Sequence, residues 1–273
     1  MQRGSDSGWA LVTGASAGLG EEFARALARR GRDVVLVARR EDRLRRLAEE
    51  LDREHGVRTL VVATDLLDAD AGARLESELA RAGVHVETFV NNAGFGAQGA
   101  FVELDRERQL DLVRLNSLVA TDLAHRFAAP MAERGRGHLL NVASTASFVP
   151  GPGMAAYYAS KAFVLSLSEA LSAELAPRGV VVTCLCPGPT DTEFRSVAGR
   201  PRSALLDRIA ARPGPVVEAG LRGLERGRAV VVPGVANKLA TVAVRFVPRW
   251  FVRRAVARVQ SALPSSRPNG PGL

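Results

Sequence analysis

Short apolar runs alternate with longer amphipathic segments along most of this chain. The short runs are rich in valine and leucine without polar alternation, which is typical of parallel strands buried on both faces. They are Trp9–Thr13, Val34–Ala38, Val57–Ala63, Val86–Val90, His138–Val142 and Val180–Cys186. The segments between them predict helices over 19–30, 41–54, 69–82, 105–134 and 155–176. We therefore predict an α/β fold with one doubly wound parallel sheet, a Rossmann fold, in which helices form the crossovers.

Local signals agree with this alternation. In the segment 41–54, Leu44, Leu47 and Leu51 recur at helical spacing, while charged residues fill the other face. A glycine follows four of the predicted helices and precedes a strand, where a left-handed helix cap is needed. These glycines are Gly31, Gly56, Gly83 and Gly179.

The 273 residues are expected to form a single domain with an added C-terminal segment. We assign 1–234 to a dinucleotide-binding and catalytic domain, 235–263 to a basic amphipathic helical segment, and 264–273 to a disordered tail. The polar N-terminus has no secretion signal, and there is no run of about 18 apolar residues that could span a membrane. A cytoplasmic location is expected.

Charge and cysteine content narrow the function classes. The net charge is +8, but residues 1–194 carry 22 basic and 26 acidic side chains, so the excess belongs to the C-terminal part. We therefore predict no nucleic-acid partner. Cys184 and Cys186 lie on one face of a predicted strand and have neither disulfide nor metal-ligand spacing. We interpret them as buried apolar residues in a reducing compartment and predict no metal site.

A glycine-rich turn follows the first predicted strand. Thr13-Gly14-Ala15-Ser16-Ala17-Gly18-Leu19-Gly20 joins that strand to a helix. A dinucleotide pyrophosphate needs a tight turn, close backbone approach and a helix N-terminus, which Gly14, Gly18 and Gly20 can supply. Glycines also occur in such turns for steric reasons alone. The position directly after the first strand favours nucleotide binding.

The end of the second strand indicates which dinucleotide binds. NAD sites place an acidic side chain there for the ribose 2′-hydroxyl, whereas a 2′-phosphate needs cations. Here Ala38 is followed by Arg39 and Arg40, which favours NADP(H) over NAD. The alternative is that both arginines simply begin a charged helix.

Four residues carry candidate catalytic chemistry. Tyr157 and Lys161 are four residues apart on a predicted helix, so the lysine ammonium can lower the pKa of the tyrosine phenol for proton transfer. Ser144 follows the fifth strand at the carboxyl edge of the sheet, where α/β proteins bind ligands. Asn116 lies inside the predicted helix 105–134, an unfavourable place for asparagine without a special partner.

Together these residues resemble the classical short-chain dehydrogenase/reductase family. The matching motifs are TGxxxGxG at 13–20, Asp65 after the third strand, NNAG at 91–94, Asn116, Ser144, YxxxK at 157–161, and Pro187-Gly188 after the sixth strand. The stretch 37–44 and Val230-Val231-Val232-Pro233-Gly234 are similar to a narrower branch, the DltE-type reductases. That branch is related to 17β-hydroxysteroid dehydrogenases and long-chain 3-ketoacyl reductases.

The resemblance implies a role for each catalytic residue. Tyr157 would be the general acid in carbonyl reduction and the base in alcohol oxidation, and Ser144 would bind the substrate oxygen. Lys161 would bind the nicotinamide ribose, and Asn116 would hold a water that links Lys161 to solvent. The implied cofactor-binding residues are Gly14, Ser16, Ala17, Gly18, Leu19, Gly20, Arg39, Arg40, Asp65, Leu66, Asn92, Ala93, Gly94, Tyr157, Lys161, Pro187, Gly188, Thr190 and Thr192.

The expected substrate is a lipophilic or acyl-chain ketone or alcohol. By resemblance, 189–212 would form a lid and 146–154 the opposite wall, and their apolar residues are Phe148, Val149, Met154 and Phe194. Basic lid residues would either favour an anionic tail such as acyl-CoA or form a solvated surface; they are Arg195, Arg200, Arg202 and Arg208. An NAD-dependent alcohol dehydrogenase and a non-catalytic NADP-sensing protein are the alternatives to an NADP(H)-dependent reductase.

After Gly234 the chain has an apolar stretch to Val247, a break at Pro248 and a second helix to about Leu263. One face of this helix is apolar, with Phe251, Val252, Ala255, Val256, Val259 and Leu263, and the other is rich in arginine. Three roles fit this pattern: contact with an anionic membrane surface, a cover over the enzyme's own pocket, or packing against a partner subunit. The resemblance also implies a homo-oligomer assembled through 105–134 and 155–176.

Overall fold

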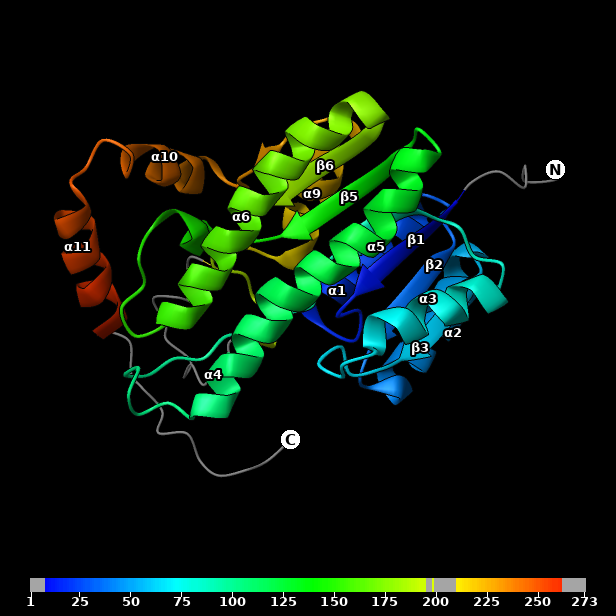
Figure 1. The fold of residues 1–273 in the computed structure, drawn as a ribbon, viewed down its shortest axis with the longest axis horizontal. Helices are drawn as coiled ribbons and strands as arrows, with labels where there is room; N and C mark the ends of the chain where they lie inside the picture. Colours follow the sequence, from blue (N-terminus) through cyan, green and yellow to red (C-terminus); the bar gives the residue numbers. More distant parts are fainter. Residues whose placement is uncertain (1–7, 195–197, 199–209, 262–273) are drawn as a thin grey trace.

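The computed structural model describes residues 8–194, 198 and 210–261, and these contain one parallel sheet in the order β3-β2-β1-β4-β5-β6-β7 (Figure 1). The strands are β1 (Trp9–Thr13), β2 (Val34–Ala38), β3 (Thr59–Ala63), β4 (Val86–Asn91), β5 (Gly137–Val142), β6 (Val180–Leu185) and β7 (Val230–Val231). The predicted doubly wound sheet is confirmed. Its order reverses between β1 and β4, and ligands bind at such a switch point. The two-residue β7 was not predicted, because it is too short to form a pattern.

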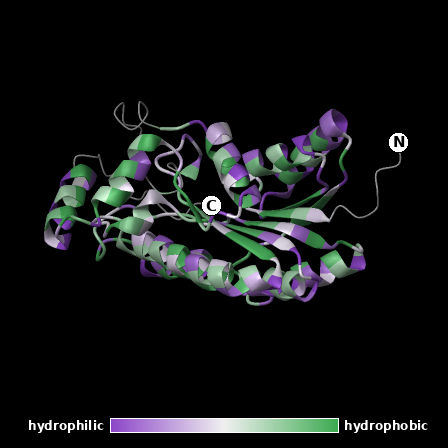
Figure 2. Cartoon of the chain, turned by 90° about the horizontal axis from the view of Figure 1, so that it is seen from above, coloured by the Kyte–Doolittle hydropathy of each residue, from purple (hydrophilic) through white to green (hydrophobic). Residues whose placement is uncertain are grey.

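One face of the sheet is covered by α1 (Gly18–Arg29), α2 (Glu41–His55) and α9 (Pro213–Glu225). The predicted apolar stripe of α2 is confirmed, since Leu44, Leu47 and Leu51 are buried in the core on this face. Figure 2 shows the largely apolar strands between two helical layers. The four glycines predicted to cap helices all have left-handed φ angles between +60° and +74°.

The other face is covered by α3 (Ala71–Arg81), α5 (Ala120–Glu133) and α6 (Ala155–Leu175). Its core contains the fully buried Phe89 of β4, whose ring centroid lies 4.8 Å from that of Phe127 on α5. Leu75 and Met131 are also fully buried there. Burial of each such side chain stabilises the fold by about 1.5–3 kcal/mol, so both helical layers are held by the apolar strands.

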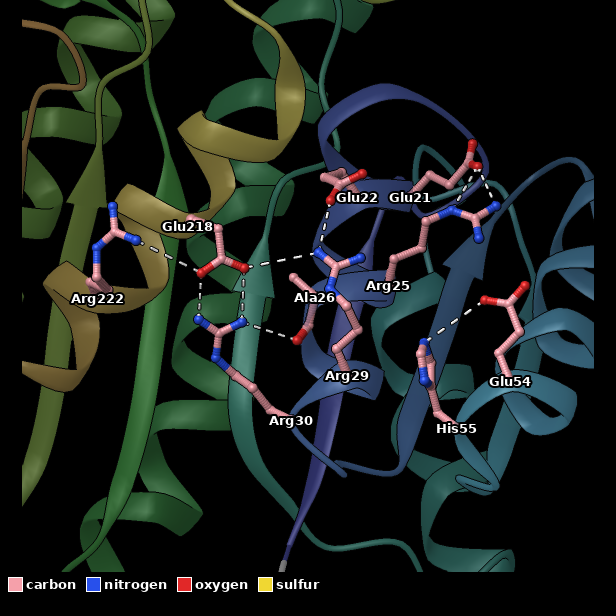
Figure 3. A network of polar contacts seen from close by, with 10 residues as sticks. All are labelled: Glu21, Glu22, Arg25, Ala26, Arg29, Arg30, Glu54, His55, Glu218 and Arg222. Atoms are coloured by element: carbon pink, nitrogen blue, oxygen red, sulfur yellow. Dashed lines mark hydrogen bonds and ion pairs between the residues drawn. The ribbon is translucent and has the colours of Figure 1, made fainter.

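Helix α9 was not predicted from the sequence. Its buried residues Val216, Val217, Leu221 and Leu224 recur at helical spacing after Pro213, a pattern that would have identified it. Ion pairs join it to α1: Glu218 lies 2.7 Å from the Arg30 guanidinium and 3.9 Å from that of Arg29 (Figure 3). These pairs are partly exposed, so apolar packing contributes more to docking than charge does.

The long helix predicted over 105–134 is interrupted. It consists of α4 (Arg106–Val113), a π-helix η1 (Arg114–Val119) and α5, and Asn116 lies in the π-helical part. Short 3₁₀ turns, η2 (Thr145–Phe148) and η3 (Ala176–Arg178), precede and follow α6. Hydrophobic periodicity does not distinguish a π-turn from a continuous α-helix, and π-turns are frequent at functional sites.

Beyond β7, α10 (Val235–Ala243) and α11 (Arg249–Ser261) lie at the end of the molecule away from α2 and α3 (Figure 1). The predicted apolar face of α11 is only partly buried: Val252 is buried, whereas Phe251 is 53% and Val259 62% exposed. The predicted tail 264–273 lies outside the described residues, and the boundary at 234 stays a prediction. Among the described helices, none has the length and apolar content required to cross a bilayer.

Candidate active site

The turn between β1 and α1 has the tight geometry that a phosphate cradle requires. Gly14 has φ +69°, a conformation that L side chains rarely adopt. A Cβ atom at Gly20 would lie 2.1 Å from the Gly14 carbonyl oxygen, so the first turn of α1 approaches the loop backbone closely. The residues predicted to hold pyrophosphate therefore form a tight turn packed on a helix N-terminus.

The segment after β4 is joined to the end of β1. The Thr13 hydroxyl accepts hydrogen bonds from the backbone amides of Asn92 and Ala93, both at 3.0 Å. The Asn92 side-chain amide donates to the Thr13 carbonyl oxygen at 2.9 Å. Asn92, Ala93 and Gly94 are thus placed beside the glycine-rich turn. This role of Thr13 in joining the two strand ends was not predicted from the sequence.

Tyr157 and Lys161 lie one turn apart on α6, as predicted. The Lys161 Nζ atom is 5.9 Å from the centre of the Tyr157 ring. Lys161 is buried and donates a hydrogen bond to the Val142 carbonyl oxygen at the end of β5, at 2.9 Å. Burial lowers the pKa of Lys161 to about 8, because desolvation disfavours its charged form.

Ser144 lies where β5 ends, between the sheet and α6. Its hydroxyl accepts a hydrogen bond from the Ala146 amide at 3.1 Å and lies 3.5 Å from the Pro187 carbonyl oxygen. Ala146 belongs to the same apolar cluster as Met154 and Tyr157. The 3₁₀ turn η2 therefore connects Ser144 with the wall around the candidate catalytic tyrosine.

Asn116 has the special partners that its position in the helix requires. Its side chain is 1% exposed and makes two hydrogen bonds with the Phe95 backbone, from Nδ2 to the carbonyl oxygen at 3.0 Å and from the Phe95 amide to Oδ1 at 3.1 Å. Nδ2 also donates to Ser160 Oγ at 3.1 Å, and Ser160 donates to the Tyr157 carbonyl oxygen at 2.8 Å. Asn116 thus joins the segment after β4 to the helical turn that carries Tyr157 and Lys161. Ser160 was not singled out from the sequence.

The two arginines at the end of β2 have different partners. Arg39 lies 3.6 Å from Asp65, the residue after β3 that resembles the family's adenine contact. Arg40 donates to Ser16 Oγ in the glycine-rich turn at 3.2 Å and to Glu193 at 3.0 Å. Leu66 is buried next to Asp65. The structure therefore brings Arg40 to the glycine-rich turn, whereas Arg39 pairs with Asp65 after β3.

The segment after β6 lies against both the turn and α10. A Cβ atom at Gly18 would lie 3.1 Å from the Thr192 side chain, and one at Gly188 would lie 2.5 Å from the Asn237 amide of α10. The Thr190 hydroxyl donates to the Gly188 carbonyl oxygen at 3.0 Å. Pro187, Gly188, Thr190 and Thr192 therefore follow one path along the candidate cofactor site. Asn237 was not anticipated.

An apolar wall surrounds Tyr157. Its ring lies 5.2 Å from the Phe194 ring and 6.1 Å from the Tyr158 ring, measured between centroids. Met154 and Phe194 join this cluster as predicted, whereas Phe148 packs in a separate cluster with the two buried free cysteines. Gln260 of α11 donates to the Tyr158 hydroxyl at 2.8 Å, so α11 reaches this wall. Arg195, Arg200, Arg202 and Arg208 lie outside the described residues.

One cavity lies away from this site. A cavity of about 330 Å³ opens between α1 and α9 near the start of β5, and its lining includes Arg32 and His138. It lies at the opposite edge of the sheet from Ser144 and Tyr157. Among the described residues, no group of three or more His, Cys, Asp or Glu is arranged to hold a metal ion.

Comparison with known proteins identifies the family of this chain. Residues 8–202 match the short chain dehydrogenase family. The chain is 32% identical over 251 residues to a very-long-chain 3-oxoacyl-CoA reductase from Pyrenophora tritici-repentis, covering 90% of this chain and 71% of that relative. Other reductases of that name align over 52% or 62% of their own length.

Solved structures show the same fold over almost the whole chain. A short-chain dehydrogenase from Sphingobium yanoikuyae in complex with NADPH is 34% identical, with a TM-score of 0.79, and the match covers 97% of this chain and 98% of that one. A bulky-bulky ketone specific alcohol dehydrogenase from Comamonas testosteroni is 32% identical, with a TM-score of 0.74 and 97% of both chains covered. The chain therefore belongs to the short-chain dehydrogenase family and is an oxidoreductase of the carbonyl/alcohol type.

Proposed function

We propose that this protein is an NADP(H)-dependent reductase of lipophilic ketones, with Tyr157 as general acid and base. The observation that carries the proposal is the placement of Tyr157, Lys161 and Ser144 at the carboxyl edge of the sheet. Lys161 lies one turn from Tyr157, and Ser144 begins the turn that packs against it. This arrangement can bind a carbonyl oxygen and protonate it as negative charge develops.

Each side chain has a distinct task in this proposal. Tyr157 donates its phenolic proton to the carbonyl oxygen during reduction and accepts it back during oxidation. Ser144 donates a hydrogen bond to the same oxygen, and the Lys161 ammonium favours the phenolate form of Tyr157. Asn116 fixes the spacing between α6 and the segment after β4 through its bonds to Phe95 and Ser160.

The residues around the glycine-rich turn fit a dinucleotide. A Cβ atom at Gly14 would lie 2.9 Å from the Asn92 side-chain amide, so glycine lets the turn pack closely against the segment after β4. Gly14, Gly18 and Gly20 would hold the pyrophosphate, Asp65 the adenine, and Asn92 to Gly94 the floor of the site. NADP(H) would supply the hydride.

Preference for NADP(H) over NAD(H) is supported by the cations at the end of β2. Arg40 lies against Ser16, so positive charge meets the glycine-rich turn where a 2′-phosphate would bind. Arg39 follows β2 as well and pairs with Asp65 at 3.6 Å. The Sphingobium yanoikuyae relative is described in complex with NADPH. An NAD-dependent alcohol dehydrogenase is the second candidate.

A lipophilic acyl substrate is supported by two observations. The wall around Tyr157 is apolar, with Met154, Ala146 and Phe194 in contact with it. The relatives at 31–32% identity over about 90% of the chain are named very-long-chain 3-oxoacyl-CoA reductases. The narrower placement with DltE-type reductases stays a prediction.

The decisive experiment compares cofactor binding and turnover. We expect NADPH to bind more tightly than NADH in a fluorescence titration, and NADPH absorbance to fall with 3-oxoacyl thioesters or bulky ketones. Tyr157→Phe should abolish turnover and keep NADPH binding, while the control Tyr158→Phe should retain most turnover. Unaffected turnover in Tyr157→Phe would refute the catalytic assignment, and NADPH binding without any turnover would favour the sensor alternative.

Homo-oligomer formation is proposed through α6 and the neighbouring η1. Large apolar side chains are exposed on these adjacent elements, with Leu118 65% and Phe163 44% exposed. Exposed apolar surface of this kind is typical of protein interfaces. Leu118→Arg should lower the mass measured by light scattering, whereas an unchanged mass would exclude this face as the interface.

Peripheral membrane contact is proposed for α10 and α11. Residues 226–261 carry eight basic and no acidic side chains. Phe246, Trp250 and Phe251 are 83%, 53% and 53% exposed beside them. Basic, aromatic surfaces bind anionic lipid. The protein should sediment with anionic vesicles but not with neutral ones, and Phe246→Ser should weaken that binding; equal recovery with both vesicle types would contradict the proposal.

A further inference from the structure

The carboxylate of Glu193 lies between two arginines at the start of α2. One oxygen is 3.0 Å from Arg40 Nη1, and the other is 2.7 Å from Arg43 Nη1. Both arginines and Glu193 are partly exposed, with 41–46% of each side chain accessible. Glu193 therefore neutralises positive charge at the place where the cofactor's 2′-phosphate is expected to bind.

Arg40 also contacts the phosphate cradle, the glycine-rich turn at 13–20. Arg40 donates to the Ser16 hydroxyl at 3.2 Å and lies 3.4 Å from the Ser16 carbonyl oxygen. Thr192, the residue before Glu193, packs against Gly18 of the cradle. Thus one short segment after β6 touches the glycine-rich turn through Thr192 and the arginines through Glu193.

We propose that Glu193 competes with the 2′-phosphate of NADP(H) for Arg40 and Arg43 and so sets how strongly the protein prefers NADP(H) to NAD(H). The inference rests on the proposed use of NADP(H). It adds two specificity residues, Arg43 and Glu193, to those expected from the sequence. Arg39 is not part of the competition, because its ion pair is with Asp65.

The charges support competition rather than shared binding. Hydrogen bonds from Arg43 and Arg40 hold the pKa of Glu193 below its usual value, so the group is a carboxylate at neutral pH. A phosphate at the same guanidinium groups would meet this negative charge at close range. The phosphate displaces the Glu193 carboxylate because it carries more charge and more acceptor oxygens. Its net affinity is reduced because two partly exposed ion pairs must break first.

The adenosine half of the cofactor gives the cleanest test. Adenosine 2′,5′-bisphosphate carries the 2′-phosphate, whereas 5′-AMP lacks it, and neither contains nicotinamide. With the full chain in a calorimetric titration, Glu193→Gln should lower the Kd of the bisphosphate about three- to tenfold and leave that of 5′-AMP unchanged. The same variant should lower the Kd of NADPH and leave that of NADH unchanged. The gain in bisphosphate affinity of Glu193→Gln should shrink at high salt, because exposed charges are screened.

Two further variants separate competition from a general charge effect. Asp191→Asn removes the same charge from an exposed side chain two residues earlier, and it should change the bisphosphate Kd less than Glu193→Gln does. Arg43→Met should weaken bisphosphate binding. In the Arg43→Met background, Glu193→Gln should give a smaller gain, because one of the two contested cations is missing.

Three results would overturn the inference while leaving NADP(H) use intact. A higher bisphosphate Kd in Glu193→Gln would mean that Glu193 positions the arginines for phosphate. Equal changes for the bisphosphate and 5′-AMP would indicate a structural role, and no change would show that Glu193 does not compete. If the wild-type chain binds both ligands equally, the proposed preference for NADP(H) is refuted as well.

Discussion

Replacing Thr13 with valine tests how the two strand ends at the switch point are held together. Thr13 is fully buried, and its hydroxyl accepts hydrogen bonds from the amides of Asn92 and Ala93 at 3.0 Å each. It also lies 3.4 Å from the Val90 carbonyl oxygen, to which it donates. Valine has nearly the same shape but has no hydroxyl, so all three interactions are lost while the packing is kept.

The expected cost follows from the two amides that lose their acceptor. An unsatisfied buried amide costs about 1–3 kcal/mol, and both of these amides are only partly buried, which favours the lower half of that range. The added methyl group returns at most about 0.8 kcal/mol. We therefore expect Thr13→Val to lower the free energy of unfolding by about 1.5–3 kcal/mol.

The assay is equilibrium unfolding in urea, with Thr183→Val as a matched control. Thr183 is also fully buried, and its hydroxyl donates a hydrogen bond to the carbonyl oxygen of the exposed residue Arg228 at 2.7 Å. Water can replace that donor, so this control should lose about 1 kcal/mol or less, and Thr13→Ser should retain most of the wild-type stability. Equal losses in the two valine variants would refute the reasoning, because stability would then not depend on the amides that Thr13 binds.

Three other predictions concern the cradle, the buried lysine and the docking of α9. Gly20→Ala should weaken NADPH binding at least about tenfold in a titration, because its Cβ would collide with the Gly14 backbone. The kcat/KM for ketone reduction should fall as pH rises through about 8, because Lys161, whose pKa burial lowers to about 8, loses its proton there. Glu218→Gln should lower the free energy of unfolding by about 0.5–1 kcal/mol at low salt and by less at high salt, since it breaks the ion pair with Arg30.

Each of these has an outcome that contradicts it. Gly214→Ala is the control for Gly20→Ala, because the nearest atom to a Cβ at Gly214 would be 3.7 Å away. Equal NADPH affinities in these two variants would show that the cradle tolerates a side chain. A flat pH profile between pH 7 and 9 would exclude Lys161 as the titrating group. If the effect of Glu218→Gln does not depend on salt, the loss comes from packing and not from charge.

Local patterns were sufficient for much of the fold and for the positions of the candidate catalytic groups. Val34–Ala38 forms a strand because a continuous apolar run can be buried on both faces of a sheet, and the structure buries all five residues. The spacing of Tyr157 and Lys161 determines that they share a helix face, whatever surrounds the helix. These features depend only on neighbours within a few residues.

Contacts between distant segments account for what the sequence did not show. The π-turn at Asn116 and its bonds to Phe95 and Ser160 depend on how η1 packs against α6. Val230–Val231 becomes a strand only because β6 lies beside it. Periodicity along the chain has no information about such partners.

By itself, the sequence determined the parallel sheet, the glycine-rich turn and the Tyr157-Lys161 pair, since each follows from residue type and local spacing. Only the tertiary structure decided that Glu193 lies between Arg40 and Arg43, which precede it by about 150 residues in the chain. The reason is physical: an ion pair needs its two charges within a few ångströms, and folding of the sheet, not local sequence, brings those charges together.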